Sequence, residues 1–500
     1  MIEIGGVTWT YPHADHPALR GLDLSIARGE LVALCGASGS GKSTALRLIN
    51  GLVPHFHDDG VLTGTVTVDG VVTTDVELDA LGSITGTVLQ HPGRQFFTDS
   101  VREETAFAME NLGFARELTR DRVDRTVARL ATWMPPDQPL RHLSGGQQQQ
   151  VAIASATAHE PRVVLLDEPS SNLSPDAVAR LIGALGQLKS AGVTIVVAEH
   201  RLRYLEGLVD RVIVMRDGAV DAVWSAAEFR GVSDADLARE GLRGEVRSAD
   251  LPSAPATGPS IEAGTGAGEV PAGEVPAGAL ELDAVRCHLG GRTVLDISRA
   301  VLRAGEVTAI RGRNGAGKST LARVITGLQR SSGVVGLDGR ELSRGARQRA
   351  SAIVMQDVQR QLFTESVEAE IRLACTDAAG DLDTSAVLAS LDLDALAQRH
   401  PLSLSGGQQQ RLVVAAARVA GRRIVVFDEP SSGVDRRHLQ SISNEIRRVA
   451  ADGAVVILIS HDDDLLALAA DRGITLVSPG ELQATPSAAT TDAQTMKETR

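Results

Sequence analysis

Two copies of one glycine-rich motif restrict the fold of this 500-residue chain more than any other feature. The stretches GASGSGKST (36–44) and GRNGAGKST (312–320) both fit the pattern G-x-x-x-x-G-K-[ST]. Each follows a short apolar run and precedes a helix-like one, which is the strand–loop–helix context that the pattern requires. The chain has only four lysines among its 50 basic residues, and Lys42 and Lys318 are two of them. Chance matches at both places are therefore negligible, and the chain must contain two such units.

The spacing of further shared motifs shows that one larger unit is repeated. The two motif lysines are 276 residues apart, whereas three later pairs are each 261 residues apart: Ser144 and Ser405, Glu168 and Glu429, His200 and His461. A constant spacing means that the two halves align there without gaps. The first half carries 15 extra residues between its lysine and the Ser144 segment.

Short apolar runs alternate with amphipathic stretches in both halves, for example ELVALCG, RVVLLDEP and VTIVVAEH. Such continuous apolar runs are typical of buried parallel strands in an α/β core. The segment from about Thr98 to His142 lacks these runs and is expected to be helical. The sequence therefore predicts an α/β protein with two P-loop NTPase domains in tandem.

Composition marks the domain boundaries. The stretch from Ser253 to Ala279 is rich in Gly, Ala and Pro and repeats AGEVP, so it is expected to be a flexible tether. We predict a first domain over 1–242, a flexible linker over 243–279, a second domain over 280–480 and a disordered tail over 481–500.

The glycine-rich motifs are expected to bind ATP. Their glycines let backbone N–H groups approach phosphates, the following helix N-terminus adds partial positive charge, and Lys42 or Lys318 reaches the outer phosphates. Ser43 and Ser319 are the expected Mg²⁺ ligands in these loops. The remaining predicted ATP-binding residues are Gly36, Ala37, Ser38, Gly39, Ser40, Gly41, Thr44, Gly312, Arg313, Asn314, Gly315, Ala316, Gly317 and Thr320.

Two adjacent acids end an apolar run in each half, in VVLLDEP (163–169) and IVVFDEP (424–430). Downstream of a P-loop, this pattern indicates a Walker B motif. Asp167 and Asp428 are then expected to assist Mg²⁺, while Glu168 and Glu429 polarise the attacking water. His200 and His461, which follow another apolar run at the same spacing, are expected to sense the γ-phosphate.

With LSGGQQQQ (143–150) and LSGGQQQR (404–411) added, each half resembles the ATPase domain of ATP-binding-cassette (ABC) proteins over nearly its whole length. The resemblance implies a RecA-like α/β core and a helical subdomain in each half, paired within the chain as a pseudo-heterodimer. It further implies that each LSGGQ segment completes the ATP site of the opposite half. The residues involved are Ser144, Gly145, Gly146 and Gln147, facing Lys318, and Ser405, Gly406, Gly407 and Gln408, facing Lys42.

The same resemblance assigns Gln90 and Gln356 to the Q-loops, where they join Mg²⁺ and water to a transport partner. It assigns Tyr11 to adenine stacking, although a tyrosine of an edge strand is an alternative interpretation. The second half departs from the family pattern because Leu289, or His288 under a shifted alignment, stands where that aromatic residue belongs.

The first half departs in its D-loop, where Ser174 replaces the aspartate that the second half keeps as Asp435. Gln150 also stands where the second half has Arg411. Neither departure removes a Walker lysine or a catalytic glutamate. We therefore expect two competent but unequal ATP sites.

The segments QHPGRQFFTDSV and QDVQRQLFTESV resemble those of energy-coupling factor (ECF) transporter ATPases, with Gln95-Phe96 matched to Gln361 and Phe363. This resemblance implies a transmembrane coupling protein and a substrate-binding membrane subunit as partners, at the cytoplasmic face of the membrane. Alternatives are a tandem sugar-importer ATPase and an ABC ATPase acting on ribosomes or DNA. The net charge of −13 and the absence of Lys and Arg between Arg247 and Arg286 argue against a nucleic acid partner.

Overall fold

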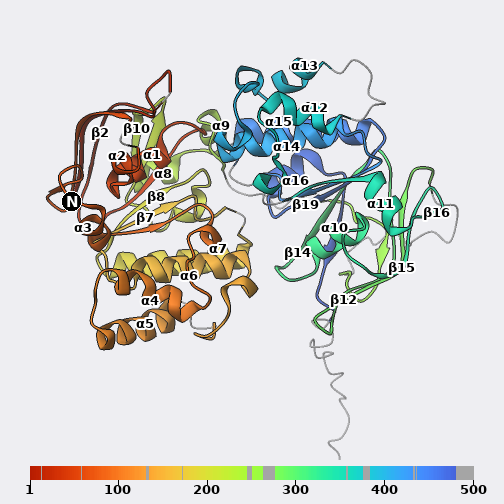
Figure 1. The fold of residues 1–500 in the computed structure, drawn as a ribbon, viewed down its shortest axis with the longest axis horizontal. Helices are drawn as coiled ribbons and strands as arrows, with labels where there is room; N and C mark the ends of the chain where they lie inside the picture. The colour runs from red at the N-terminus through yellow and green to blue at the C-terminus, as the bar shows by residue number, and fades with distance from the viewer. Residues whose placement is uncertain are drawn as a thin grey trace, which may run out of the picture.

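The computed structural model describes residues 1–12, 14–57, 59–130, 134–171, 173–244, 251–262, 276–355, 358–375, 383–431, 434 and 436–479. It consists of two bodies of similar architecture, here called the first half (1–244) and the second half (251–479). Figure 1 shows them side by side, with the helices α4 to α6 at the bottom of the first half and α12 to α14 at the top of the second.

The core of the first half is a six-stranded sheet in the order β10-β9-β3-β8-β7-β6. Its strands pair in parallel except for the edge pair β9 and β10. The four central strands are almost wholly buried, in agreement with the apolar runs in the sequence. The strands are β3 (Leu31–Cys35), β6 (Thr85–Val88), β7 (Val163–Asp167), β8 (Thr194–Ala198), β9 (Arg211–Arg216) and β10 (Ala219–Ser225).

An antiparallel sheet in the order β2-β1-β4-β5 covers this core. The helix α1 (Lys42–Ile49) lies between the two sheets and buries Leu48 and Ile49 in a cluster shared by both. The P-loop is therefore held between two packed layers. The strands are β1 (Ile2–Thr10), β2 (Leu19–Ile26), β4 (Val61–Val68) and β5 (Val71–Val72).

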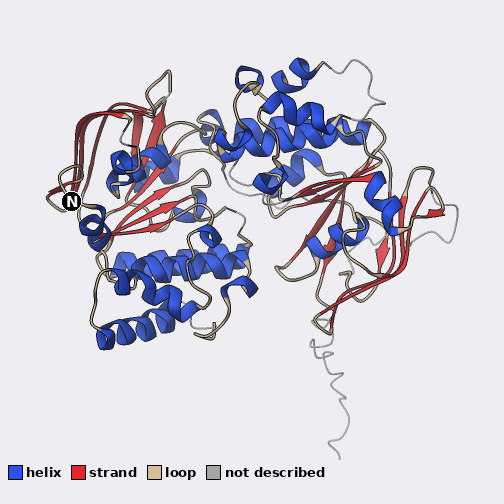
Figure 2. Ribbon diagram, viewed as in Figure 1, coloured by secondary structure: helices blue, strands red, loops and turns tan. Residues whose placement is uncertain are grey.

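Helices form the remainder of the first half (Figure 2). The expected helical segment is confirmed, because α4 (Val101–Asn111) and α5 (Arg116–Leu130) pack on α6 (Gly145–Thr157) around a separate cluster that includes Met109 and Val127. The other helices are α2 (Leu52–His55), α3 (Leu78–Ile84), α7 (Pro175–Ser190), α8 (Ala226–Gly231) and α9 (Asp234–Arg239).

The second half repeats the same plan. Its parallel sheet has the order β17-β18-β19-β14-β20, and its antiparallel sheet the order β11-β13-β12-β15-β16. The parallel strands are β14 (Val307–Gly312), β17 (Ser351–Val354), β18 (Ile424–Asp428), β19 (Val455–Ile459) and β20 (Arg472–Leu476). The antiparallel ones are β11 (Ala256–Thr257), β12 (Leu280–Leu289), β13 (Arg292–Leu302), β15 (Ser332–Leu337) and β16 (Arg340–Glu341).

The helices of the second half are α10 (Lys318–Ile325), α11 (Arg344–Ala350), α12 (Val367–Ala374), α13 (Thr384–Ala389), α14 (Gly406–Val419), α15 (Arg436–Ala451) and α16 (Asp463–Ala469). The predicted fold class, two tandem α/β P-loop domains with helical subdomains, is confirmed. Within the described parts of the chain, no helix is long and apolar enough to cross a membrane.

The predicted flexible linker over 243–279 is wrong for part of its length. The side chain of Arg243 is only 2% exposed, and the strand β11 pairs with β13 at the edge of the second half's antiparallel sheet. Backbone bridges also join Ser253 to Gly473 and Ile261 to Leu476. This segment can order because its small side chains fit against the sheet and its backbone satisfies edge donors and acceptors. Residues 245–250, 263–275 and 480–500, which include the predicted tail, lie outside the described residues.

Candidate functional site

Each glycine-rich loop connects an inner strand of its parallel sheet, β3 or β14, to the following helix. Gly36 and Gly312 have φ angles of 144° and 139°, and a Cβ on either would lie 2.2 Å from a backbone carbonyl oxygen. The Nζ atom of Lys42 donates to the Gly36 and Ala37 carbonyls at 2.9 and 3.0 Å. Lys318 Nζ donates in the same way to Gly312 and Arg313 at 2.8 and 3.1 Å. Both loops therefore curl around an ammonium group that is positioned to meet phosphate oxygens.

Tyr11 lies against the first of these loops. Its hydroxyl is 3.2 Å from Thr44 Oγ1 and accepts a hydrogen bond from Arg47 at 3.2 Å. The ring makes edge contacts with Trp9 and His57 at centroid distances of 5.5 and 5.1 Å. In the second half, His288 instead hydrogen-bonds Thr293, and Leu289 is 40% exposed. The structure thus places an aromatic side chain beside the P-loop helix of the first half.

The expected magnesium ligands lie together in both halves. Ser43 Oγ donates to Asp167 Oδ1 at 3.0 Å, and in the second half Ser319 lies close enough to Asp428 to act on its pKa. Burial, together with Glu168, raises the pKa of Asp167 to about 6, and burial also raises the pKa of Asp428. A buried carboxylate beside a hydroxyl is a donor set that Mg²⁺ accepts, and the cation would offset the unfavourable burial of the negative charge. These residues therefore fit the expected ion.

The two glutamates predicted to be catalytic share an unusual backbone conformation. Glu168 and Glu429 have φ angles of 46° and 54°, in the left-handed region that non-glycine residues seldom adopt. Their N–H groups donate to Ala198 and Ile459 at 2.8 and 2.9 Å, which fixes them at the end of the Walker B strands. Strained residues of this kind cluster at functional sites.

The glutamate side chains have different surroundings. Glu168 is held by three groups: His200 Nε2 lies 3.1 Å from Oε1, Gln90 Nε2 donates to Oε2 at 2.8 Å, and Ser171 Oγ donates to Oε2 at 3.2 Å. Among the described residues, Glu429 accepts hydrogen bonds from Ser460 Oγ at 3.2 Å and from the His461 backbone at 3.4 Å. Gln356, the expected counterpart of Gln90, lies outside the described residues.

These surroundings shift the pKa values in opposite directions. Burial alone would raise the pKa of Glu168, but His200, Lys42 and Ser171 together lower it to about 2. Burial and the neighbouring Asp428 raise the pKa of Glu429 to about 7. Burial, with the charges of Lys318 and Arg201, lowers the pKa of His461 to about 4. The two halves therefore place the same acid in two electrostatic states.

Each LSGGQ segment begins a helix through a reciprocal cap. Ser144 Oγ accepts from the Gln147 N–H at 3.4 Å, and Gln147 Oε1 accepts from the Ser144 N–H at 2.7 Å. Ser405 and Gln408 repeat this arrangement at 3.4 and 2.9 Å. A Cβ on Gly145 or Gly406 would meet nothing within 4 Å, so the backbone is open on that side. The glutamines thus have a structural role that the sequence analysis missed.

Some of the predicted residues come together across the two halves. Ser144 and Gln147 line one cleft with Gly312, Arg313, Asn314 and Gly315, which are the P-loop of the other half. Gly406 lines a different cleft, together with Gly145 and the segment that begins at Gln90. The pairing of Ser405 with Lys42 stays a prediction.

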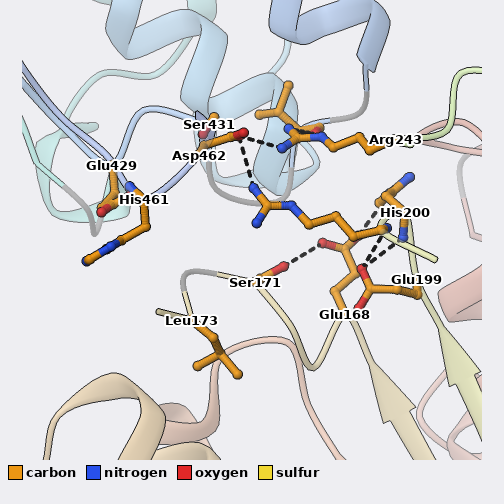
Figure 3. A pocket seen from close by; sticks show the side chains of 12 residues that line it. Glu168, Ser171, Leu173, Glu199, His200, Arg243, Glu429, Ser431, His461 and Asp462 are labelled. Atoms are coloured by element: carbon orange, nitrogen blue, oxygen red, sulfur yellow. Dashed lines mark hydrogen bonds and ion pairs between the residues drawn. The ribbon is translucent and has the colours of Figure 1, made fainter. Parts of the chain in front are cut away.

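One pocket between the halves is lined by the predicted catalytic residues of both. Figure 3 shows Glu168 and His200 on one side of it and Glu429 and His461 on the other. The pocket also contains Glu199, Arg201, Arg243 and Asp462, which the sequence analysis missed. The signal was present in the sequence, because Glu199-His200-Arg201 aligns with Ser460-His461-Asp462 at the spacing of 261 residues.

Two P-loops with paired acids, each beside a histidine segment, define a tandem P-loop ATPase. The family model described as ABC transporter matches residues 19–171 and 295–432. The chain is 36% identical to an ABC transporter ATP-binding protein of Treponema denticola over 96% of both chains. It is also 36% identical to one of Streptomyces avermitilis, over 97% of this chain and 93% of that one. The chain therefore belongs to the ABC transporter ATPase family.

Among solved structures, the RNase-L Inhibitor superimposes with a TM-score of 0.58 and 21% identity, over 94% of this chain and 87% of that one. At this identity the likeness supports the fold alone. Family membership implies that the chain binds and hydrolyses ATP, with Mg²⁺ typical of the family.

Proposed function

We propose that the chain is the ATPase of an ECF-type importer, which takes up a vitamin, a vitamin precursor or a metal ion. It works at the cytoplasmic face of the membrane with a transmembrane coupling protein and a substrate-binding membrane subunit. Two ATP molecules bind between the halves, each held by one P-loop and the LSGGQ segment opposite. The observation that most strongly supports this arrangement of the ATP sites is the cleft shared by Ser144, Gln147 and the P-loop of the second half.

Within each site, the glutamate that follows the Walker B strand orients the attacking water. His200 and Gln90 position Glu168, whereas Ser460 and the backbone of His461 position Glu429. Lys42 and Lys318 leave their carbonyl partners for the phosphates when ATP enters. Ser43 and Asp167, or Ser319 and Asp428, would hold Mg²⁺, which would supply positive charge to the phosphates.

Two loops, one in each half, have the same hydrogen-bond pattern, and they support the proposal of a membrane partner. Glu104 Oε2 accepts from the N–H groups of Phe97 and Thr98, at 3.0 Å each, and Glu370 holds Phe363 and Thr364 in the same way at 3.1 Å. Phe97 and Phe363 are consequently presented to solvent, with exposures of 74% and 77%. The exposed aromatic of the first half is thus Phe97, whereas Phe96, which the sequence analysis had matched to Phe363, packs against the core.

An exposed aromatic ring on a well-braced loop is suited to anchoring a partner helix. Two such rings, one following the Q-loop of each half, give the coupling protein two equivalent contacts. Because the loops are joined to Gln90 and to the Gln356 segment, movement of the cassettes on ATP binding is passed to the membrane.

The test is copurification from a detergent extract. The wild-type chain should bring down a membrane protein, and the Phe97→Ala/Phe363→Ala variant should lose it without a change in unfolding temperature. Phe56→Ala provides a matched control, because Phe56 is 68% exposed but lies outside both loops. Its complex should persist. Ribosomes in place of a membrane protein would favour the ribosome-acting alternative and overturn the proposal.

A further inference from the structure

Two equivalent residues of the two halves contact one another. Arg201 follows the histidine of the first half and Asp462 follows that of the second, at the same spacing of 261 residues as the other paired motifs. Arg201 Nη2 lies 3.1 Å from Asp462 Oδ2. In a pair of similar bodies related by a twofold rotation, only positions on the rotation axis can touch their own equivalents. This ion pair therefore marks the pseudo-twofold axis of the molecule.

A second arginine completes the cluster. Arg243, which follows the last helix of the first half, reaches across to the carboxylate of Asp462 and to the Val434 carbonyl of the second half's D-loop (Figure 3). The side chains of Arg243 and Asp462 are 2% and 3% exposed, and that of Arg201 is 24% exposed. The backbone N–H of Arg243 donates to the His200 carbonyl at 3.1 Å, which fixes the arginine beside the first catalytic segment.

The charge balance of the cluster depends on which halves meet. When unlike halves meet, two arginines surround the buried carboxylate of Asp462, and the nearby carboxylates of Glu199 and Asp464 offset the remaining positive charge. When two first halves meet, four arginines gather at the axis, and when two second halves meet, two aspartates face each other. Buried like charges are strongly disfavoured because neither water nor a counter-charge compensates them.

We propose that Arg201, Arg243 and Asp462 select the pairing of unlike halves, so that a first half accepts only a second half as its partner. This inference rests on the proposed function in one respect, namely that the halves pair to bind ATP. It goes further by assigning the choice of partner to three charged side chains rather than to the P-loops or LSGGQ segments.

Charge reversal tests the inference in the full chain. Asp462→Arg gathers three arginines at the axis and should weaken the pairing of the halves by roughly a hundredfold or more, the scale of a buried pair that loses one partner. Arg201→Asp leaves one arginine between two aspartates and should have the smaller effect. The double variant Arg201→Asp/Asp462→Arg restores two positive charges and one negative charge, so ATP turnover should return in a particle of one chain.

The most discriminating experiment mixes the Arg201→Asp chain with the Asp462→Arg chain. Position 201 of the Arg201→Asp chain is then negative, and position 462 of the Asp462→Arg chain is positive. These two opposite charges can meet at the axis when the first half of one chain pairs with the second half of the other. The native pair, Arg201 with Asp462, forms at the second interface of the same particle. A two-chain particle with regained ATP turnover should form, visible by light scattering as twice the 52.5 kDa mass of one chain. Arg239→Asp is the matched control, because Arg239 is 76% exposed and its ion pair with Asp236 lies within α9.

Several outcomes would overturn the inference: single variants that turn over ATP like the wild type, a double variant no better than the singles, or a mixture without two-chain particles. None of these would touch the proposed function, provided that the Glu168 and Glu429 variants described below still lose turnover and the membrane partner still copurifies. If the membrane partner no longer copurifies but the pairing still depends on these charges, the proposed function is overturned and the inference on pairing stands.

Discussion

The two histidine segments, Glu199-His200-Arg201 and Ser460-His461-Asp462, occupy the same place in two copies of one fold, yet they contact the predicted catalytic glutamates differently. Glu199 accepts hydrogen bonds from Ser170, from Tyr204 and from the backbone of His200. The side chain of Glu199 is long enough to accept all of these hydrogen bonds. Glu168 does not take part in them and pairs with the His200 ring.

Ser460 is too short to reach such partners and donates to Glu429 instead. The buried Nε2 atom of His461 has no hydrogen-bond partner among the described residues, and no ion pair with Glu429 is formed in that part of the chain. The exchange of Glu199 for Ser460 therefore accompanies opposite pKa shifts of the two acids, to which Asp462, after the second histidine, contributes by raising the pKa of Glu429. Duplicated halves can keep the same Walker and LSGGQ motifs and still hold equivalent acids at different pKa values.

Removing the catalytic acids should give the largest effect. Glu168→Gln/Glu429→Gln is expected to lower steady-state ATP turnover by roughly 10²–10⁴-fold, the usual contribution of a general base. Each single variant should retain part of the activity, and the two should differ because the acids have different partners. Near-normal turnover in the double variant would show that neither glutamate activates water.

Making the first half resemble the second is the next test. Glu199→Ser removes the acceptor for Ser170, Tyr204 and the His200 N–H, so it should destabilise the first half by about 3 kcal/mol. The measurement is urea unfolding, with Glu206→Ser as control because Glu206 is partly exposed and its ion pair with Arg203 is a local one. Equal midpoints for Glu199→Ser and wild type would contradict the structural role of Glu199.

The pH dependence of stability probes the residue after the histidine. Although burial by itself would raise the pKa of Asp462, Arg243 and Arg201 hold it well below its usual range. Because the pKa is lower in the folded than in the unfolded chain, the ionised group stabilises the fold above a pH of about 4, and this contribution is lost as the pH falls further.

Asp462→Asn should therefore lower the free energy of unfolding by about 2 kcal/mol at pH 7, and the gap to the wild type should narrow below about pH 4. Unfolding of both proteins in urea between pH 3 and 7 gives the comparison. A gap that stays constant across this range would mean that Asp462 is not held ionised by its two arginines.

The smallest expected effect concerns the adenine end of the two sites. Tyr11→Leu gives the first half the residue type of the second and should raise the ATP concentration for half-maximal turnover about fivefold, from the loss of about 1 kcal/mol of stacking. Leu289→Tyr is the reciprocal change and should act in the opposite direction. An unchanged ATP dependence in Tyr11→Leu would support the alternative of a purely structural tyrosine.

Much of the molecule was predictable because its signals are local. A P-loop requires a strand, a glycine turn and a helix within a short stretch of chain, so GASGSGKST and GRNGAGKST fixed both the fold class and the positions of Lys42 and Lys318. The spacing of 261 residues aligned the halves, and the helices between Thr98 and His142 followed from the absence of apolar runs.

Other features escaped prediction because they depend on neighbours far along the chain. Composition favoured a flexible tether around Ala256. In the structure, the backbone of this segment instead hydrogen-bonds to β13 at the edge of the antiparallel sheet of the second half. Whether Phe96 or Phe97 is exposed depends on the hydrogen bonds of Glu104, which no pattern of apolar residues reports.

The sequence by itself determined that there are two P-loop units, what each can bind and which residues are paired by duplication, because these properties reside in short contiguous motifs. Only the tertiary structure decided how the duplicates differ. The opposed pKa shifts of Glu168 and Glu429 arise from burial and from the charged groups that the fold gathers around each acid. The contact between Arg201 and Asp462 exists because two similar bodies meet at an axis, and an axis is a property of the assembled halves.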